Sequence, residues 1–178
     1  RPGERGKAVK MEDMTIDLGL PAKEVKSLVR VGDIITFKSP LVSMQNQFVN
    51  GKSIDDRAGV AVLLETMKEL DKLRFDADVY FVATVQEEVG TRGATISTYN
   101  VNPDIGIAID VTHGDTPDSP KEETHEMDKG PSIAVGPNMH PKLTQKLLDT
   151  TKEYGLAYQI EVAPGPTGTD ARAMQIVR

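Results

Sequence analysis

The stretch DVYFVATVQEEVG, residues 78–90, decides how the rest of the chain is interpreted. Its first part is almost continuously apolar, β-branched or aromatic, which predicts a buried strand. Neighbouring side chains of a strand point to opposite faces, so Glu87 and Glu88 within it would force one charge into the core. Val89 and Gly90 end the apolar run directly after the pair. We therefore expect Glu87 and Glu88 at the carboxyl end of a strand, where open α/β sheets build their sites.

Strands and helices alternate from residue 51 onward. The clearest helix is predicted over residues 58–73, because its apolar residues recur at helical spacing. Such alternation predicts an α/β fold, a three-layer sandwich with a mixed, partly parallel sheet. The other expected elements are a short helical connection at 93–99, strands at 104–111, 132–135 and 157–162, a helix at 141–154, and a last helix after the Gly/Pro loop that follows residue 162.

The first 50 residues have a different character. Apolar residues alternate loosely with polar ones between Val9 and Leu18, and residues 31–37 read as a turn followed by a strand. Pro21 begins one or two predicted helical turns over residues 21–27. We therefore expect residues 1–50 to be part of a small β-rich domain, and residues 51–178 to be a partial α/β domain that carries the chemistry.

Composition narrows the classes of function. The net charge of −6, without a basic cluster, argues against a nucleic-acid surface. No apolar run approaches the ~20 residues that span a bilayer, so no membrane partner is expected. Cysteine is absent, which leaves carboxylate and imidazole as metal ligands and favours a cytoplasmic protein.

Both ends of the sequence look like cuts. The chain starts at Arg1 without an initiator methionine, and it stops at Arg178 inside the last predicted helix. We therefore expect these 178 residues to be part of a longer protein.

Acidic residues fall at three equivalent positions of the predicted fold. Asp55 and Asp56 open the first long helix, Glu87 and Glu88 end one strand, and Asp110 ends the next. These positions meet at one edge of a sheet, where carboxylates without Lys or Arg between them repel unless a cation neutralises them. A pair of divalent ions about 3.5–4 Å apart is the usual arrangement in hydrolases. The spacing predicts a hydrolytic metal centre.

Each acidic position also has a plain structural interpretation. Asp55 or Asp56 fits the N-cap of the helix that follows. Glu87 and Glu88 fit a solvated turn, and Asp110 fits a strand-end turn residue. The three histidines lie in predicted loops. Among them we keep His113, three residues after Asp110, as an outside candidate; the other two are His125 and His140.

Four motifs occur in order along nearly the whole chain: KSIDDRAG at 52–59, VQEEVGTRGA at 85–94, IDVTH with GDTP at 109–117, and GTDA at 168–171. This series resembles the glutamyl and tetrahedral aminopeptidase family of two-metal exopeptidases. The resemblance implies a zinc-exopeptidase-like sandwich and a hydrolase that removes amino-terminal residues from peptides.

The resemblance also implies a role for each site residue. Two divalent ions (Zn, Co or Mn) would be held by Asp55 as the bridging ligand, by Glu88 on one ion and by Asp110 on the other. Glu87 matches the general base that takes a proton from the attacking water.

The residues around these ligands match supporting roles. Asp56 matches the neighbour reached through a cis peptide, and Arg57 would steady the aspartates. Gly168, Thr169 and Asp170 match a loop near the substrate cleft.

Other family features concern the chain as a whole. The first 50 residues would be the remnant of an inserted, β-barrel-like assembly domain, and the protein would be a homo-oligomer, a dodecamer built from dimers. The family uses two further histidine ligands, and their segments have no counterpart in this sequence. We therefore expect the 178 residues alone to be inactive.

Two other functions stay open at this point. The chain fits a truncated or degenerate family member that serves only as an assembly or binding module. Paired carboxylates also occur in glycoside hydrolases, where they flank the bond from two sides. The adjacency of Glu87 and Glu88, the absence of Trp and the 4% aromatic content argue against that second alternative.

Overall fold

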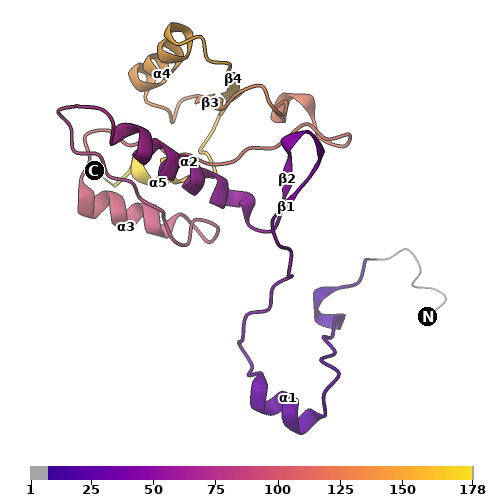
Figure 1. Cartoon of the computed structure of the whole chain (residues 1–178). Helices are drawn as coiled ribbons and strands as arrows, with labels where there is room; N and C mark the ends of the chain where they lie inside the picture. The colour runs from indigo at the N-terminus through magenta and orange to yellow at the C-terminus, as the bar shows by residue number, and fades with distance from the viewer. Residues whose placement is uncertain (1–7, 178) are drawn as a thin grey trace. The chain divides into compact units, whose positions relative to one another are not determined.

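The computed structural model describes residues 8–177 and divides into two units, Arg1–Ser39 and Pro40–Arg178. The first unit contains the 3-10 helix η2 (Met11–Asp13) and the helix α1 (Ala22–Leu28), drawn in indigo and violet in Figure 1. α1 confirms the helical turns predicted after Pro21, which is the N-cap residue. The domain boundary predicted near residue 50, with an assembly role for the part before it, stays a prediction.

The strands expected in the first unit do not form within its described residues. Residues 31–37 are a turn and an extended segment, and the apolar side chains of Ile34 and Phe37 are 90% and 88% exposed. A strand requires a hydrogen-bonded neighbour as well as an alternating sequence. The prediction of strands here was wrong because no such neighbour lies beside these residues in the described unit.

The second unit begins with a short antiparallel pair and its longest helix. β1 (Val42–Ser43) pairs with β2 (Val49–Asn50) around the 3-10 helix η3 (Gln45–Gln47). α2 (Ile54–Leu70) follows, in place of the helix predicted over 58–73.

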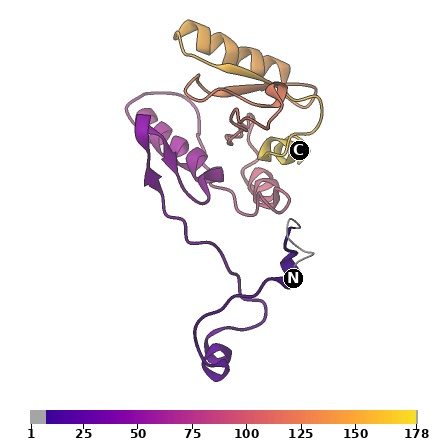
Figure 2. The same cartoon turned by 90° about the vertical axis from the view of Figure 1, so that its right-hand side faces the viewer.

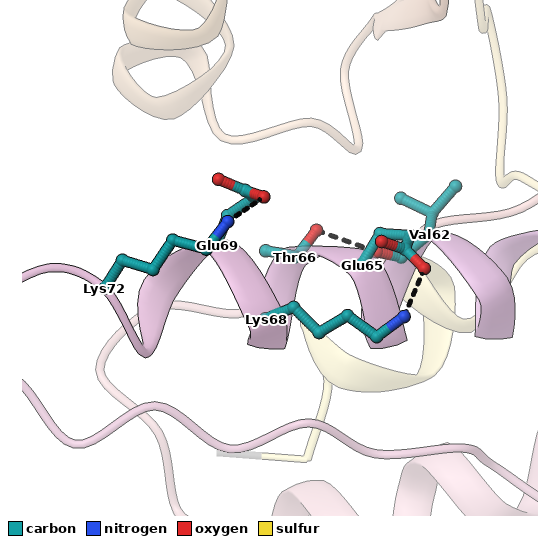
Figure 3. A network of polar contacts seen from close by, with 6 residues as sticks. All are labelled: Val62, Glu65, Thr66, Lys68, Glu69 and Lys72. Carbon is teal, nitrogen blue, oxygen red and sulfur yellow. Dashed lines mark hydrogen bonds and ion pairs between the residues drawn. The ribbon is translucent and has the colours of Figure 1, made fainter.

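The exposed side of α2 carries local polar contacts, shown in Figure 3. Lys68 and Lys72 each lie 2.6 Å from a glutamate three residues earlier, and the Thr66 hydroxyl donates to the Val62 carbonyl at 2.8 Å. Pairs of this kind stabilise a helix by about 0.2–0.5 kcal/mol each. They support α2 locally.

A parallel β-α-β unit is the best-ordered part of the sheet structure. β3 (Ser132–Val135) pairs with β4 (Gln159–Val162) in the register Ser132↔Gln159 to Val135↔Val162, and α4 (Pro141–Glu153) connects them. α4 packs against β3, as Figure 2 shows. Pro141 stands at the start of the helix, as predicted. All three elements confirm the sequence prediction within two residues at each end.

Two helices pack together beneath the candidate site. α3 (Arg92–Val101) contacts α5 (Asp170–Met174), and both views place them side by side (Figures 1 and 2). Ala94 of α3 and Ala173 of α5 are 1% and 3% exposed, and they mark the core here. The loop before β3 contains the 3-10 helix η4 (Lys121–Glu123).

The strands predicted at 78–86 and 104–111 are absent from the described structure. Both segments are largely extended, but neither belongs to a ladder, and Tyr80 and Ile105 are 64% and 66% exposed. The prediction failed for the same reason as in the first unit: within residues 8–177 neither segment has a strand beside it. The helices with two small sheets, one antiparallel and one parallel, nevertheless give the α/β class that the sequence predicts, with part of the pairing parallel.

Among the residues described, none of the helices has the length and apolar character needed to cross a bilayer.

Candidate functional site

Asp55 and Asp56 lie in the first turn of α2. The peptide bond between them is cis, and neither residue has helical backbone angles. The Gly59 N–H donates to Asp56 Oδ1 at 2.8 Å, a bond to the amide three residues on, as N-cap residues make. The capping interpretation therefore applies to Asp56, and Asp55 is exposed.

Glu87 and Glu88 lie in a turn between the extended segment and α3. The N–H groups of Gly90 and Thr91 both donate to the Glu87 carbonyl at 2.9 Å. The Gly93 N–H donates to the Val85 carbonyl at 2.9 Å, and a Cβ on Gly93 would overlap that carbonyl. Glycine at this position therefore lets α3 begin directly against the backbone that leads into the two glutamates.

Asp110 ends the extended segment 104–110, where the sequence places it. Its side chain is exposed, and its Oδ1 accepts a hydrogen bond from the N–H of Val111 at 2.8 Å. That bond is the local contact of a turn residue, and it leaves Oδ2 for other partners.

Asp170 is the first residue of α5, and Thr169 is the N-cap that accepts from the Ala171 N–H. The Thr84 hydroxyl donates to Asp170 Oδ2 at 2.6 Å, which joins α5 to the segment before Glu87. The other oxygen, Asp170 Oδ1, is buried and has no hydrogen-bond partner among the described residues. Sequence reasoning missed Thr84, although a hydroxyl inside an apolar run was a usable signal.

The electrostatics show that these acidic residues lie near one another. Burial raises the pKa of Asp56, Glu87 and Asp110, and the charges of neighbouring carboxylates raise each pKa further. Asp55 and Asp170 contribute to all three shifts. The structure therefore gathers the whole predicted set of acids into one negative region: Asp55, Asp56, Glu87, Glu88, Asp110 and Asp170.

Cationic side chains do not neutralise this region. In the part of the chain that the structure describes, every lysine ion pair goes to another carboxylate, such as Glu65, Glu69 or Asp115. Arg57 follows Asp56 in α2, is exposed, and forms no ion pair there. An uncompensated set of carboxylate oxygens, one of them buried without a donor, has the chemistry that a divalent cation requires.

The acids are not assembled tightly enough to hold an ion as they stand. Within residues 8–177, no three Asp, Glu or His side chains have the closeness of a metal site. Charges influence each other over about 10 Å, whereas ligand oxygens approach zinc to about 2.0–2.2 Å. The kinds of ligand present suit a metal ion. In this structure, however, the carboxylates lie within electrostatic range of one another and farther apart than the ligands of a bound ion.

The remaining candidates have local roles in the structure. Thr169 Oγ1 lies 3.1 Å from Thr167 Oγ1 in the loop that also contains Gly168. His140 caps α4, and the His113 carbonyl accepts from the His125 N–H at 2.9 Å. His113 is thus tied by its backbone to the loop before β3.

The open depression along α2 contains none of the candidate residues. Its volume is about 470 Å³, and it is lined by Ala61, Val62, Glu65, Thr66 and Glu69. The polar side chains among them contact other residues of α2 or the lysine that follows it.

Comparisons with known proteins give one consistent result. The family described as M42 glutamyl aminopeptidase matches residues 1–178. The lysyl aminopeptidase of Pyrococcus furiosus is 34% identical over 177 residues, 98% of this chain and 51% of that protein.

Two solved structures have the same fold. The TET aminopeptidase of a marine sediment archaeon of the Thaumarchaeota superposes with a TM-score of 0.88 at 34% identity, over 100% of this chain and 52% of that one. The TET1 peptidase of Pyrococcus horikoshii, described as assembling into a tetrahedron or an octahedral shell, gives 0.80 at 31% identity, over 97% and 52%. The chain therefore spans about half the length of the relatives it matches.

Proposed function

Because the chain belongs to the M42 glutamyl aminopeptidase family, we propose that it supplies the carboxylate part of the catalytic centre of a metal-dependent aminopeptidase. Its substrates would be peptides, from which it removes amino-terminal residues. The observation that supports this proposal most strongly is the gathering of six acids without a cationic partner among the described residues.

Three of these acids would hold two divalent ions, zinc, cobalt or manganese. Asp55 would bridge the ions, with Glu88 on one and Asp110 on the other. When bound, the ions would polarise the scissile carbonyl and lower the pKa of the attacking water. The donor set suits this task because carboxylate oxygens accept several divalent metals.

Glu87 would act as the general base. It is half-buried and sits beside Glu88 in the turn fixed by the Gly90 and Thr91 amides. From there it would take the proton of the attacking water and return it to the leaving amine. The turn would keep Glu87 in place during both transfers.

The neighbouring residues would support this centre. Asp56 is held by the Gly59 amide and would orient Asp55, with Arg57 steadying both aspartates. Gly168, Thr169 and Asp170 would border the substrate cleft.

Two statements concern the chain as a whole. The three ligand positions are fewer than the five that the resemblance implies, so the 178 residues alone should hold metal weakly and should not turn over. The TET1 peptidase of Pyrococcus horikoshii assembles into a tetrahedron or an octahedral shell. We extend assembly to the whole protein, which would be a cytoplasmic homo-oligomer. Residues 1–50 would belong to its assembly domain.

Metal-dependent stabilisation tests the site in the chain itself. A ligand at ten times its Kd stabilises the folded state by about 1.4 kcal/mol, which raises Tm by about 3–6 °C. We expect added Mn²⁺ to raise the Tm of the unmodified chain, and to do so much less in Glu88→Ala and Asp110→Ala. Glu65→Ala is the matched control, because Glu65 is an exposed acid on α2 that pairs with Lys68. Equal shifts in all four proteins would contradict the assignment.

The activity is tested on the whole protein. An aminopeptidase cleaves an aminoacyl 4-nitroanilide but not its N-acetylated analogue, because it recognises the free amine. Cleavage of both compounds, or cleavage that a chelator leaves unchanged, would refute the proposed reaction.

A further inference from the structure

The two segments that bear the candidate ligands are not held to each other by a ladder. Residues 78–88 lead to Glu88 and residues 104–110 lead to Asp110, and neither is paired in the described structure. A two-metal site needs its ligands at a defined separation. Some other element must therefore set the distance between these segments.

The first end of α5 is attached to the Glu88 segment. Asp170 accepts the 2.6 Å hydrogen bond from Thr84, which lies three residues before Glu87. A hydrogen bond to an ionised carboxylate is shorter and stronger than one between neutral groups. It joins residues that are 86 positions apart in the sequence.

The other end of α5 touches the Asp110 segment. The methyl group of Met174 lies so close to Gly106 that a Cβ there would overlap it. Gly106 is four residues before Asp110. A five-residue helix rises about 7.5 Å, so one short rigid element reaches both segments.

α5 is itself fixed to α3. The two helices contact each other, and each contains a buried alanine, Ala94 in α3 and Ala173 in α5. The turn with Glu87 and Glu88 runs directly into α3. α5 is therefore connected to the Glu88 segment twice, directly through Thr84 and indirectly through α3.

We infer that α5 is a bracket that sets the spacing of Glu88 and Asp110, with Asp170 as a positioning residue that acts through Thr84. This inference rests on the proposed metal site but assigns Asp170 a task different from binding metal or substrate. The inference also explains why the partly buried carboxylate of Asp170 lies beside other acids. Its hydrogen bond to Thr84 orders the segment that leads to Glu88.

Manganese binding measured by electron paramagnetic resonance tests the bracket. The signal of free Mn²⁺ gives the Kd directly, even for weak sites. We expect Thr84→Val, which removes the donor of the hydrogen bond to Asp170, to raise the Kd at least about tenfold, a loss of about 1.4 kcal/mol. Thr84→Ser keeps the hydroxyl and should restore the wild-type Kd. Thr95→Val is the control, because the Thr95 hydroxyl bonds within α3 to the Thr91 carbonyl.

Amide hydrogen exchange of the metal-free chain separates this inference from the proposed function. Thr84→Val should speed exchange at the amides of Gly90, Thr91 and Gly93. Exchange at Gln159 in β4, and at Ala163 directly after β4, should stay unchanged. If the unmodified chain binds no Mn²⁺, the proposed metal site fails for this chain. Hydrogen exchange would still show whether α5 orders the segment that leads to Glu88. Unchanged exchange in Thr84→Val, or a Kd within twofold of wild type, would overturn the inference.

Discussion

The β3–α4–β4 unit and the two carboxylate-bearing segments begin from the same kind of sequence and end differently. Each consists of short apolar runs that lead into a turn or helix. β3 and β4 pair over four residues, whereas 78–86 and 104–110 are extended without a ladder in the described structure. An apolar run thus predicts extended backbone, and a strand forms only where a neighbour supplies the hydrogen bonds.

The paired unit is also fastened by side chains. The Ser132 hydroxyl donates to Glu161 Oε2 at 3.2 Å and lies 3.0 Å from His125 Nε2. Since that hydroxyl gives its proton to Glu161, the His125 ring nitrogen is the donor in the second contact. The carboxylate region has a single long-range clamp of this kind among the described bonds, Thr84 to Asp170. The region proposed for chemistry is therefore the less restrained of the two.

The largest expected effect comes from the core beneath the carboxylate region. Ala94→Asp places an unpaired charge at the α3–α5 interface, which should lower the free energy of unfolding by at least about 3 kcal/mol and Tm by about 6–12 °C. Thermal melts measure it. Ala77→Asp, at an exposed position before the extended segment, should stay within about 0.5 kcal/mol. Equal effects of the two variants would show that the α3–α5 interface does not support the fold.

The second variant disturbs the turn that carries Glu87 and Glu88. Gly93→Ala forces a methyl group against the Val85 carbonyl and should cost about 1–3 kcal/mol. Exchange at Gly90 and Thr91 should accelerate, while β4 amides keep their protection. Gly165→Ala is the control, because nothing lies within 4 Å of its added Cβ. Slow exchange in the Gly93 variant would contradict the close approach.

Ser132→Ala weakens the paired unit instead. It removes the contacts to His125 and Glu161 and should cost about 1 kcal/mol. Urea unfolding measures the loss, and exchange should rise at Gln159 but not at Gly90. Ser27→Ala, where the exposed hydroxyl bonds to the Glu24 carbonyl in α1, should cost less. A rise at Gly90 would mean that the two regions open together.

The smallest effect is the pH dependence of the metal-free chain. The folded pKa values of Asp56, Glu87 and Asp110 are raised by burial and by the charges of neighbouring carboxylates, Asp55 and Asp170 among them in each case. Their contribution to stability is present below the unfolded pKa of about 4, and it is lost as pH rises through the folded values. Asp110→Asn should flatten this loss by less than about 1 kcal/mol, because exposed charges are screened. If Asp110→Asn lost Tm more steeply than the unmodified chain between pH 3 and 7, the predicted direction of the effect would be wrong.

The sequence predicts best where local chemistry decides. α4 with its leading Pro141, and the positions of β3 and β4 along the chain, follow from periodicity and turn residues. The position of Glu87 and Glu88 before Gly90 was also predictable, because two charges cannot continue a buried strand. Whether residues 78–86 pair with another strand was not predictable, because pairing depends on residues far away in the sequence.

Long-range contacts explain what was missed in the site. The bond between Thr84 and Asp170 spans 86 positions, and the close approach of Met174 to Gly106 spans 68. Neither leaves a periodic signal. The roles of Asp55, Glu88 and Asp110 as ligands rest on the motif series and stay predictions.

Paramagnetic broadening by Mn²⁺ in amide NMR spectra tests whether the carboxylates bind the ion, because it locates the ion even when binding is weak. The account predicts that the amides of Asp56, Glu88 and Val111 broaden first, and that Gln159 and Ala163 keep their intensity. Broadening centred on Glu65 and Glu69 of α2, or spread evenly over the acidic surface, would contradict a metal site at these carboxylates.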